Sequence, residues 1–196
     1  HCAPKPKVKK CKEFTDNLII RGQDYGEAKK ISHEIQEREN RIFISSYNDI
    51  DVVIANGTVA LEVVDDVSQV DRIFVPIGGG GLISGVCNVI DHFQPNAKIV
   101  GVQASRANTV IPSLNNDAPV RIESVDTIAD GIAVNKLGID AFDTIKRHVD
   151  EFNLVSRSQL EDTIRIFATR ENQILEPAGA AAVAAMFDRK YQSPSE

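Results

Sequence analysis

Short apolar runs alternate with longer segments of helical periodicity along most of the chain. This alternation is typical of βαβ units, in which crossover helices join parallel strands. The expected strands, in chain order, cover residues 18–20, 41–45, 73–77, 98–102 and 152–155. The pattern therefore predicts an α/β fold built on an open, mostly parallel sheet.

Segments with apolar residues at helical spacing separate these strands. An amphipathic helix is expected from about Tyr25 to Glu39, with Ala28, Ile31 and Ile35 turned inward. A helix opened by Ser156 or Ser158 is expected to run to about Asn172. The remaining helices are expected at about residues 51–64, up to 93 after the glycine run 78–81, at 140–148 and from 177 onward. Small residues dominate the last helix, which favours close packing on the sheet.

Four consecutive glycines, Gly78, Gly79, Gly80 and Gly81, stand between the strand at 73–77 and the helix that follows it. Glycine lets successive amide groups approach one anion without interference from a Cβ atom. The helix N-terminus behind them adds orphan N–H donors and the positive end of a dipole. The segment therefore predicts a phosphate-binding loop. The alternative, a mobile glycine linker, is disfavoured because strand and helix patterns directly flank the glycines.

Nucleotide-binding fingerprints do not fit this loop. Triplets of the G-x-G-x-x-G type that start at Gly78 or Gly79 end at Ile83 or Ser84. A Walker A reading requires Lys and then Ser or Thr after Gly85, where the chain has Val86 and Cys87. The remaining interpretation is a site for a single phosphate ester, held by backbone amides.

Composition narrows the function classes. A net charge of −6 disfavours a nucleic-acid binder, and the local basic run at 5–12 is interpreted as a solvated helix face. No apolar stretch approaches the length of a membrane span, and lysines rather than an apolar segment follow the first residues, so neither a membrane protein nor a secretory leader is expected. Cys2, Cys11 and Cys87 form no CxxC pair, which favours a reduced, cytoplasmic protein. The four histidines show no ligand spacing, so zinc is not expected.

Five segments resemble motifs of one enzyme family. The run Val75–Gly85 resembles the phosphate loop of pyridoxal-phosphate enzymes of the tryptophan-synthase-β type (fold type II), in the branch of threonine/serine dehydratases and serine racemases. Four further segments are similar to motifs of that branch in the same order: Ala3-Pro4 with the lysines that follow, 56–62, 127–134 and 175–180.

The resemblance implies a cofactor and a domain arrangement. The implied cofactor is pyridoxal 5'-phosphate, which would bind between a large and a small α/β domain in a three-layer fold. Residues 1–48 are then expected to be the tail of the small domain, and residues 49–196 most of the large one. The family's Schiff-base lysine lies in an S-x-K-x-R-G-A-like motif upstream of the motifs found here. This chain alone is therefore not expected to convert a substrate. A homo-oligomer, dimer or tetramer, is also implied.

The resemblance also assigns roles to individual residues. The phosphate is expected on Gly78, Gly79, Gly80, Gly81 and the amide of Leu82. Gly131 would bring backbone close to the 3′ oxygen of the ring, or would be a simple turn glycine. Glu176 would face the ring or the domain interface, or would stabilise the dipole of the helix after Pro177.

Some positions depart from the family pattern. Gln103 and Thr109 stand where metal-dependent racemase-like members carry a glutamate and an aspartate, so no metal is expected. Tyr47 replaces an asparagine of the racemases and resembles the aromatic residue of the dehydratases. The interpretation is therefore an L-threonine/L-serine dehydratase that yields a 2-oxo acid and ammonia. Serine racemase and a non-catalytic paralogue are the alternatives.

Overall fold

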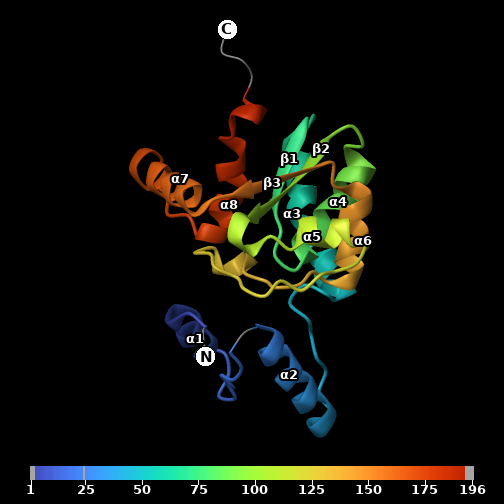
Figure 1. The fold of residues 1–196 in the computed structure, drawn as a ribbon, viewed down its shortest axis with the longest axis vertical. Helices are drawn as coiled ribbons and strands as arrows, with labels where there is room; N and C mark the ends of the chain where they lie inside the picture. The colour runs from blue at the N-terminus through green and yellow to red at the C-terminus, as the bar shows by residue number, and fades with distance from the viewer. Residues whose placement is uncertain (1–2, 24, 193–196) are drawn as a thin grey trace. The chain divides into compact units, whose positions relative to one another are not determined.

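The computed structural model describes residues 3–23 and 25–192, which divide into two compact units, 1–44 and 45–196 (Figure 1). Among the described residues, no helix combines the length and the apolar character that a membrane span requires. Cys11 and Cys87 are free thiols, and Cys2 lies outside the described residues.

The first unit contains two helices, α1 (Lys5–Lys12) and α2 (Tyr25–Glu39), and neither buries a residue. The lysines of α1 are exposed, which confirms the solvated helix face. The bounds predicted for α2 are confirmed, but Ala28 is exposed rather than turned inward.

The strands predicted at 18–20 and 41–45 are wrong, because the described part of the first unit forms no strand. Ile19, Ile42 and Ile44 are instead largely exposed. An extended apolar segment is stabilised as a strand only when a neighbouring strand accepts its backbone hydrogen bonds. A hydrophobic pattern alone does not supply that neighbour.

The second unit is built on a sheet of three parallel strands in the order β1 (Arg72–Pro76), β2 (Lys98–Ala104) and β3 (Glu151–Val155). In the register, Phe74 lies beside Val100 and Val102 beside Asn153. The parallel sheet that the pattern predicted after residue 49 is therefore confirmed.

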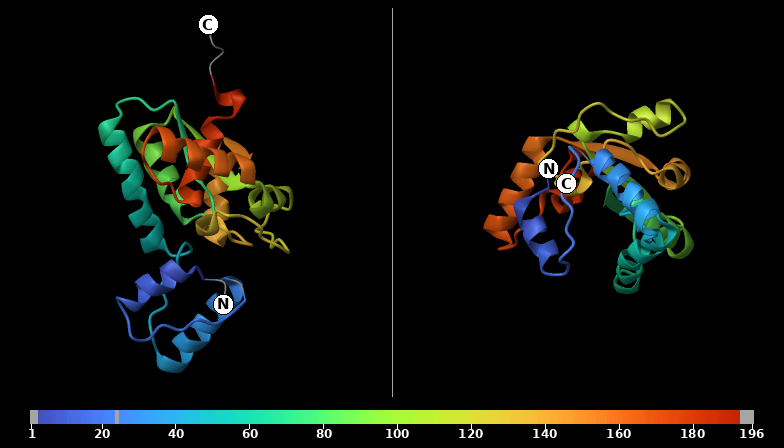
Figure 2. Two further views of the ribbon diagram at one scale, coloured as in Figure 1. Left: turned by 90° about the vertical axis from the view of Figure 1, so that its left-hand side faces the viewer. Right: turned by 90° about the horizontal axis from the view of Figure 1, so that it is seen from below.

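Helices cover both faces of the sheet, which gives three layers (Figures 1 and 2). One layer contains α3 (Ile50–Asp66), α4 (Gly81–Phe93) and α6 (Ile139–His148), and the other contains α7 (Arg157–Arg170) and α8 (Pro177–Met186). All five helices were predicted, and the side chain of Ser156 caps α7 in a capping box with Gln159. The short helix α5 (Val110–Asn115) was not predicted.

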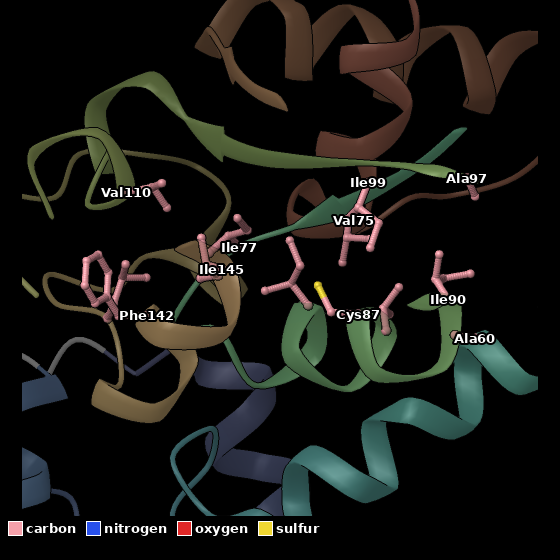
Figure 3. Close-up of a cluster of buried hydrophobic side chains, with 13 residues drawn as sticks. Ala60, Val75, Ile77, Cys87, Ile90, Ala97, Ile99, Val110, Phe142 and Ile145 are labelled. Carbon is pink, nitrogen blue, oxygen red and sulfur yellow. The ribbon is translucent and has the colours of Figure 1, made fainter. Parts of the chain in front are cut away.

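Two hydrophobic clusters hold the layers together, one on each face of the sheet. Figure 3 shows the first, in which Val75 and Ile99 of the sheet pack toward Cys87 and Ile90 of α4. Burial in this cluster raises the pKa of the Cys87 thiol to about 12, so Cys87 is a packing residue rather than a reactive thiol. In the second cluster Ala180, Ala181, Ala184 and Ala185 of α8 are buried against the sheet.

Glycines let α3 approach α4 closely. A Cβ atom added to Gly85 would lie 2.5 Å from the carbonyl oxygen of Val53, and one added to Gly57 would lie 3.2 Å from that of Gly85. These contacts fix the start of α4, which carries the glycine run, against its neighbour helix.

One carboxylate joins the beginnings of two neighbouring strands. Asp150, just before β3, accepts hydrogen bonds from the Lys98 ammonium (2.7 Å) and the Ile99 amide (2.8 Å) of β2. Burial raises the pKa of Asp150, but the bonds from Lys98 and Ile99 outweigh it, so the pKa lies below its ordinary value of 3.8.

Because this pKa is lowered in the folded state, Asp150 stabilises the fold above pH 3.8, and that contribution is lost as the pH falls through the lowered pKa. We predict that Asp150→Asn lowers the free energy of unfolding by about 1 kcal/mol at pH 7. The difference should shrink below pH 3.8. Urea unfolding across this pH range measures the difference, with Asp143→Asn, at an exposed position of α6, as the control. Equal stability of the Asp150 variant and the wild type at pH 7 would contradict the prediction.

Candidate functional site

The glycine run lies at the carboxyl end of β1 and leads directly into α4. Ligands of open α/β sheets bind at this edge. Gly80 is the N-cap of α4, with φ of 103°, a left-handed conformation that favours glycine. The predicted order of strand, glycines and helix N-terminus is therefore confirmed.

Three glycines of the run, Gly79, Gly80 and Gly81, leave no room for a side chain. An added Cβ atom would lie 2.2 Å from Cγ of Tyr47 at Gly79, and 2.4 Å from Cβ of Ala141 at Gly80. At Gly81 it would lie 2.9 Å from Cα of Tyr47, while Gly78 is less tightly packed. The need for glycine here is therefore steric as well as conformational, which is not true of a mobile linker.

The carbonyl groups of the loop are hydrogen-bonded on one side. The carbonyl oxygen of Gly79 accepts from the Gly138 amide (3.0 Å), and that of Gly80 accepts from the amide (3.0 Å) and hydroxyl (2.8 Å) of Ser84. In a trans peptide the N–H group points away from the C=O group of the same unit. The amides of Gly80 and Gly81 are therefore turned away from these partners.

The amides of the loop, in contrast, have no partner in the part of the chain that the structure describes. None of its hydrogen bonds is donated by a backbone N–H group between Gly78 and Leu82. Gly79–Gly81 are buried, and Gly78 and Leu82 are partly exposed. Buried N–H groups without a partner are rare in proteins, and a row of them at a helix N-terminus is suited to an anion. The residues present thus fit a phosphate group.

The structure brings the other two predicted site residues to the same place. A Cβ atom on Gly78 would lie 3.4 Å from the carbonyl oxygen of Gly131, and one on Gly131 would lie 3.2 Å from Oε1 of Glu176. Three segments far apart in the sequence therefore meet beside the loop. Glu176 is the N-cap of α8 but makes no side-chain capping bond.

Gln103 and Thr109, the positions that depart from the metal-dependent pattern, hydrogen-bond to each other, with Nε2 of Gln103 donating to Oγ1 of Thr109 (2.9 Å). Within residues 3–23 and 25–192, no three His, Cys, Asp or Glu side chains are grouped as a metal site would need. Ser84 and Gly138, which orient the loop, were not singled out from the sequence. Their bonds to the loop depend on the turn conformation and on long-range packing.

The sequence is similar to those of known enzymes. A family model described as "Pyridoxal-phosphate dependent enzyme" matches residues 1–196. An L-threonine ammonia-lyase of Thermotoga maritima is 36% identical over 187 residues, which cover 95% of this chain and 47% of that protein. The catabolic L-threonine dehydratase of Escherichia coli K12 is 32% identical, with coverage of 96% and 57%. The chain thus spans about half the length of these curated relatives.

Solved structures confirm the fold class. Maize serine racemase superposes with a TM-score of 0.89 at 28% identity, covering 98% of this chain and 58% of that one. The processed threonine deaminase isoform 2 of Solanum lycopersicum gives a TM-score of 0.87 at 29% identity, covering 94% and 54%. The α/β fold with an open parallel sheet is that of the fold type II enzymes. Because the family match extends over the whole sequence, the chain belongs to the pyridoxal-phosphate-dependent enzymes.

Proposed function

We propose that this chain is the phosphate-binding part of an L-threonine/L-serine ammonia-lyase, which releases ammonia and a 2-oxo acid from its substrate. The row of unpaired amides between Gly78 and Leu82 carries the proposal. The ammonia-lyase and dehydratase relatives support the substrate class. When bound, pyridoxal phosphate joins the substrate amine and withdraws electrons from its Cα atom.

In this proposal the phosphate oxygens accept hydrogen bonds from the amides of Gly78, Gly79, Gly80, Gly81 and Leu82. The α4 dipole adds a favourable field, because the phosphate lies at the helix N-terminus. The loop is largely buried, and a low local dielectric strengthens these interactions relative to water. The cofactor is thereby anchored by its phosphate while its other end reacts.

We further propose that Gly131 and Glu176 border the ring end of the cofactor. Gly131 lies beside Gly78, so a group bound at the loop extends past it. A side chain at residue 131 would lie 2.9 Å from Cβ of Ala178 and would crowd Glu176. Glycine here keeps backbone accessible to the ring. In the same proposal residues 1–48 are the tail of the small domain and residues 49–196 most of the large one, whereas the two compact units divide between residues 44 and 45.

Binding to the loop is tested by a pair of isosteric variants. Gly78 is the site of choice because an added Cβ atom would have no contact closer than 3.1 Å, to Cα of Ile132. We predict that Gly78→Asp binds inorganic phosphate and pyridoxal phosphate about tenfold more weakly than Gly78→Asn, because the carboxylate repels the phosphate. Isothermal titration calorimetry on the 196-residue chain measures both affinities.

Gly78→Asn is the matched control, because it adds the same bulk without the charge, and circular dichroism checks that both variants fold. Equal phosphate affinities of the two variants would place the anion elsewhere. Absence of phosphate binding by the wild-type chain would overturn the proposed site.

The reaction is tested on the full gene product that carries this chain. We predict that L-threonine yields 2-oxobutyrate and ammonia, and that L-serine yields pyruvate in excess of D-serine. Serine racemase is the second candidate because the maize enzyme shares the fold closely. Lactate dehydrogenase-coupled detection of the 2-oxo acid and chiral chromatography of serine distinguish them. D-Serine as the main product from L-serine would contradict the proposed lyase activity and support a racemase.

A further inference from the structure

The side chain of Gln103, near the carboxyl end of β2, is 2% exposed and uses both of its polar atoms. Its Oε1 accepts hydrogen bonds from the amides of Thr109 and Val110, each at 2.9 Å. Its Nε2 donates to Oγ1 of Thr109 (2.9 Å) and to the carbonyl oxygen of Ile77 (3.2 Å). Gln103 thus links the start of α5 to the residue that precedes the glycine run.

The bond to Ile77 bears directly on the phosphate loop. The Ile77 carbonyl belongs to the same peptide unit as the amide N–H of Gly78, and in a trans unit the two point in opposite directions. The Ile77 amide is itself fixed, because it donates to the carbonyl oxygen of Val102 at 2.7 Å. Gln103 therefore sets the rotation of the one peptide unit that presents the Gly78 N–H group.

Two further carbonyl groups of the loop are held by hydrogen bonds in the same way. The Gly138 amide holds the carbonyl of Gly79, and Ser84 holds that of Gly80. Gln103, Gly138 and Ser84 come from three different parts of the second unit. Together they hold the carbonyls of residues 77, 79 and 80 and so turn the next amides to the other side.

We propose that Gln103 is a positioning residue of the phosphate site, which directs the Gly78 N–H group toward the bound phosphate. The inference rests on the proposed function, because it assumes that the loop binds a phosphate. Gln103 does not touch the anion itself but acts through the Ile77 carbonyl.

The competing explanation is that Gln103 only caps α5, and the two roles use different atoms. Capping uses Oε1, whereas orientation of the loop uses Nε2. Gln103→Glu separates them, because a carboxylate still accepts from the amides of Thr109 and Val110 but cannot donate to Ile77 when ionised. The measurement is made at pH 8 to favour the ionised form, whose charge also repels the Ile77 carbonyl oxygen.

We expect Gln103→Glu at pH 8 to bind inorganic phosphate and pyridoxal phosphate about tenfold more weakly than the wild-type chain, the cost of a misdirected hydrogen bond to a charged group. Calorimetry on the 196-residue chain measures it. Ser113→Ala is the matched control. Ser113 is buried on α5, donates to the Thr109 carbonyl (2.6 Å) and accepts from the Val120 amide (2.9 Å), and none of these hydrogen bonds involves Ile77. We expect this control to lower the melting temperature while phosphate affinity stays at the wild-type value.

A second measurement follows the loop directly without ligand. In ¹⁵N–¹H spectra, the Gly78 amide resonance should move in Gln103→Glu and stay in place in Ser113→Ala. Gln103→Met removes the Nε2 donor together with the Oε1 acceptor, without adding charge, and should move the Gly78 resonance in the same direction, so it takes over if Gln103→Glu does not fold. An unmoved Gly78 resonance together with wild-type phosphate affinity would reduce Gln103 to a cap of α5.

The phosphate affinity of the wild-type chain tests the site itself, and that of the Gln103 variants tests the positioning role. If the wild-type chain binds no phosphate, the site assignment fails, while a Gly78 resonance that moves only in the Gln103 variants still supports the orienting role. If the wild-type chain binds phosphate and the Gln103 variants bind it equally well, the site stands and the positioning role is overturned.

Discussion

Peptide units can bind an anion through their N–H groups only if their carbonyl oxygens are held on the opposite side, because the two groups of a trans unit point in opposite directions. In the loop after β1, the carbonyls of Ile77, Gly79 and Gly80 are held in this way by Gln103, Gly138 and Ser84. Glycine is needed at residues 79–81 because Tyr47 and Ala141 pack where side chains would stand. The chemistry of the site is thus set by neutral groups that surround the loop rather than by a charged residue within it.

The rest of the second unit keeps this arrangement in place. Parallel pairing of β1 with β2 brings Gln103 beside Ile77, and the cluster that includes Cys87 and Ile90 fixes α4 against the sheet. On the other face, the alanine surface of α8 allows its N-terminus, with Glu176, to lie beside Gly131. Close packing therefore brings together site residues from segments that are about fifty residues apart along the chain.

Much of this could be predicted from the sequence, and the failures have physical causes. Residues 49–196 show clear periodicity because each element there has a layer to pack against, so their strands and long helices were predicted. The segments at 18–20 and 41–45 show a similar pattern but lack a strand partner within the described residues, and form no strand. Helix α5 was missed because six residues are too few to show a helical repeat. The glycine run is a local signal in the sequence. The contacts of Gln103 and Gly138 with it are long-range, so no spacing of residues along the chain predicts them.

The most direct test of the account is a titration of the ¹⁵N-labelled chain with inorganic phosphate, followed by the amide resonances in ¹⁵N–¹H spectra. If the loop binds phosphate, the amides of residues 78–82 should shift downfield together and saturate with one dissociation constant, because each gains a hydrogen bond to the same anion. Shifts confined to the exposed lysine helix at residues 5–12, with the glycine amides unmoved, would contradict it.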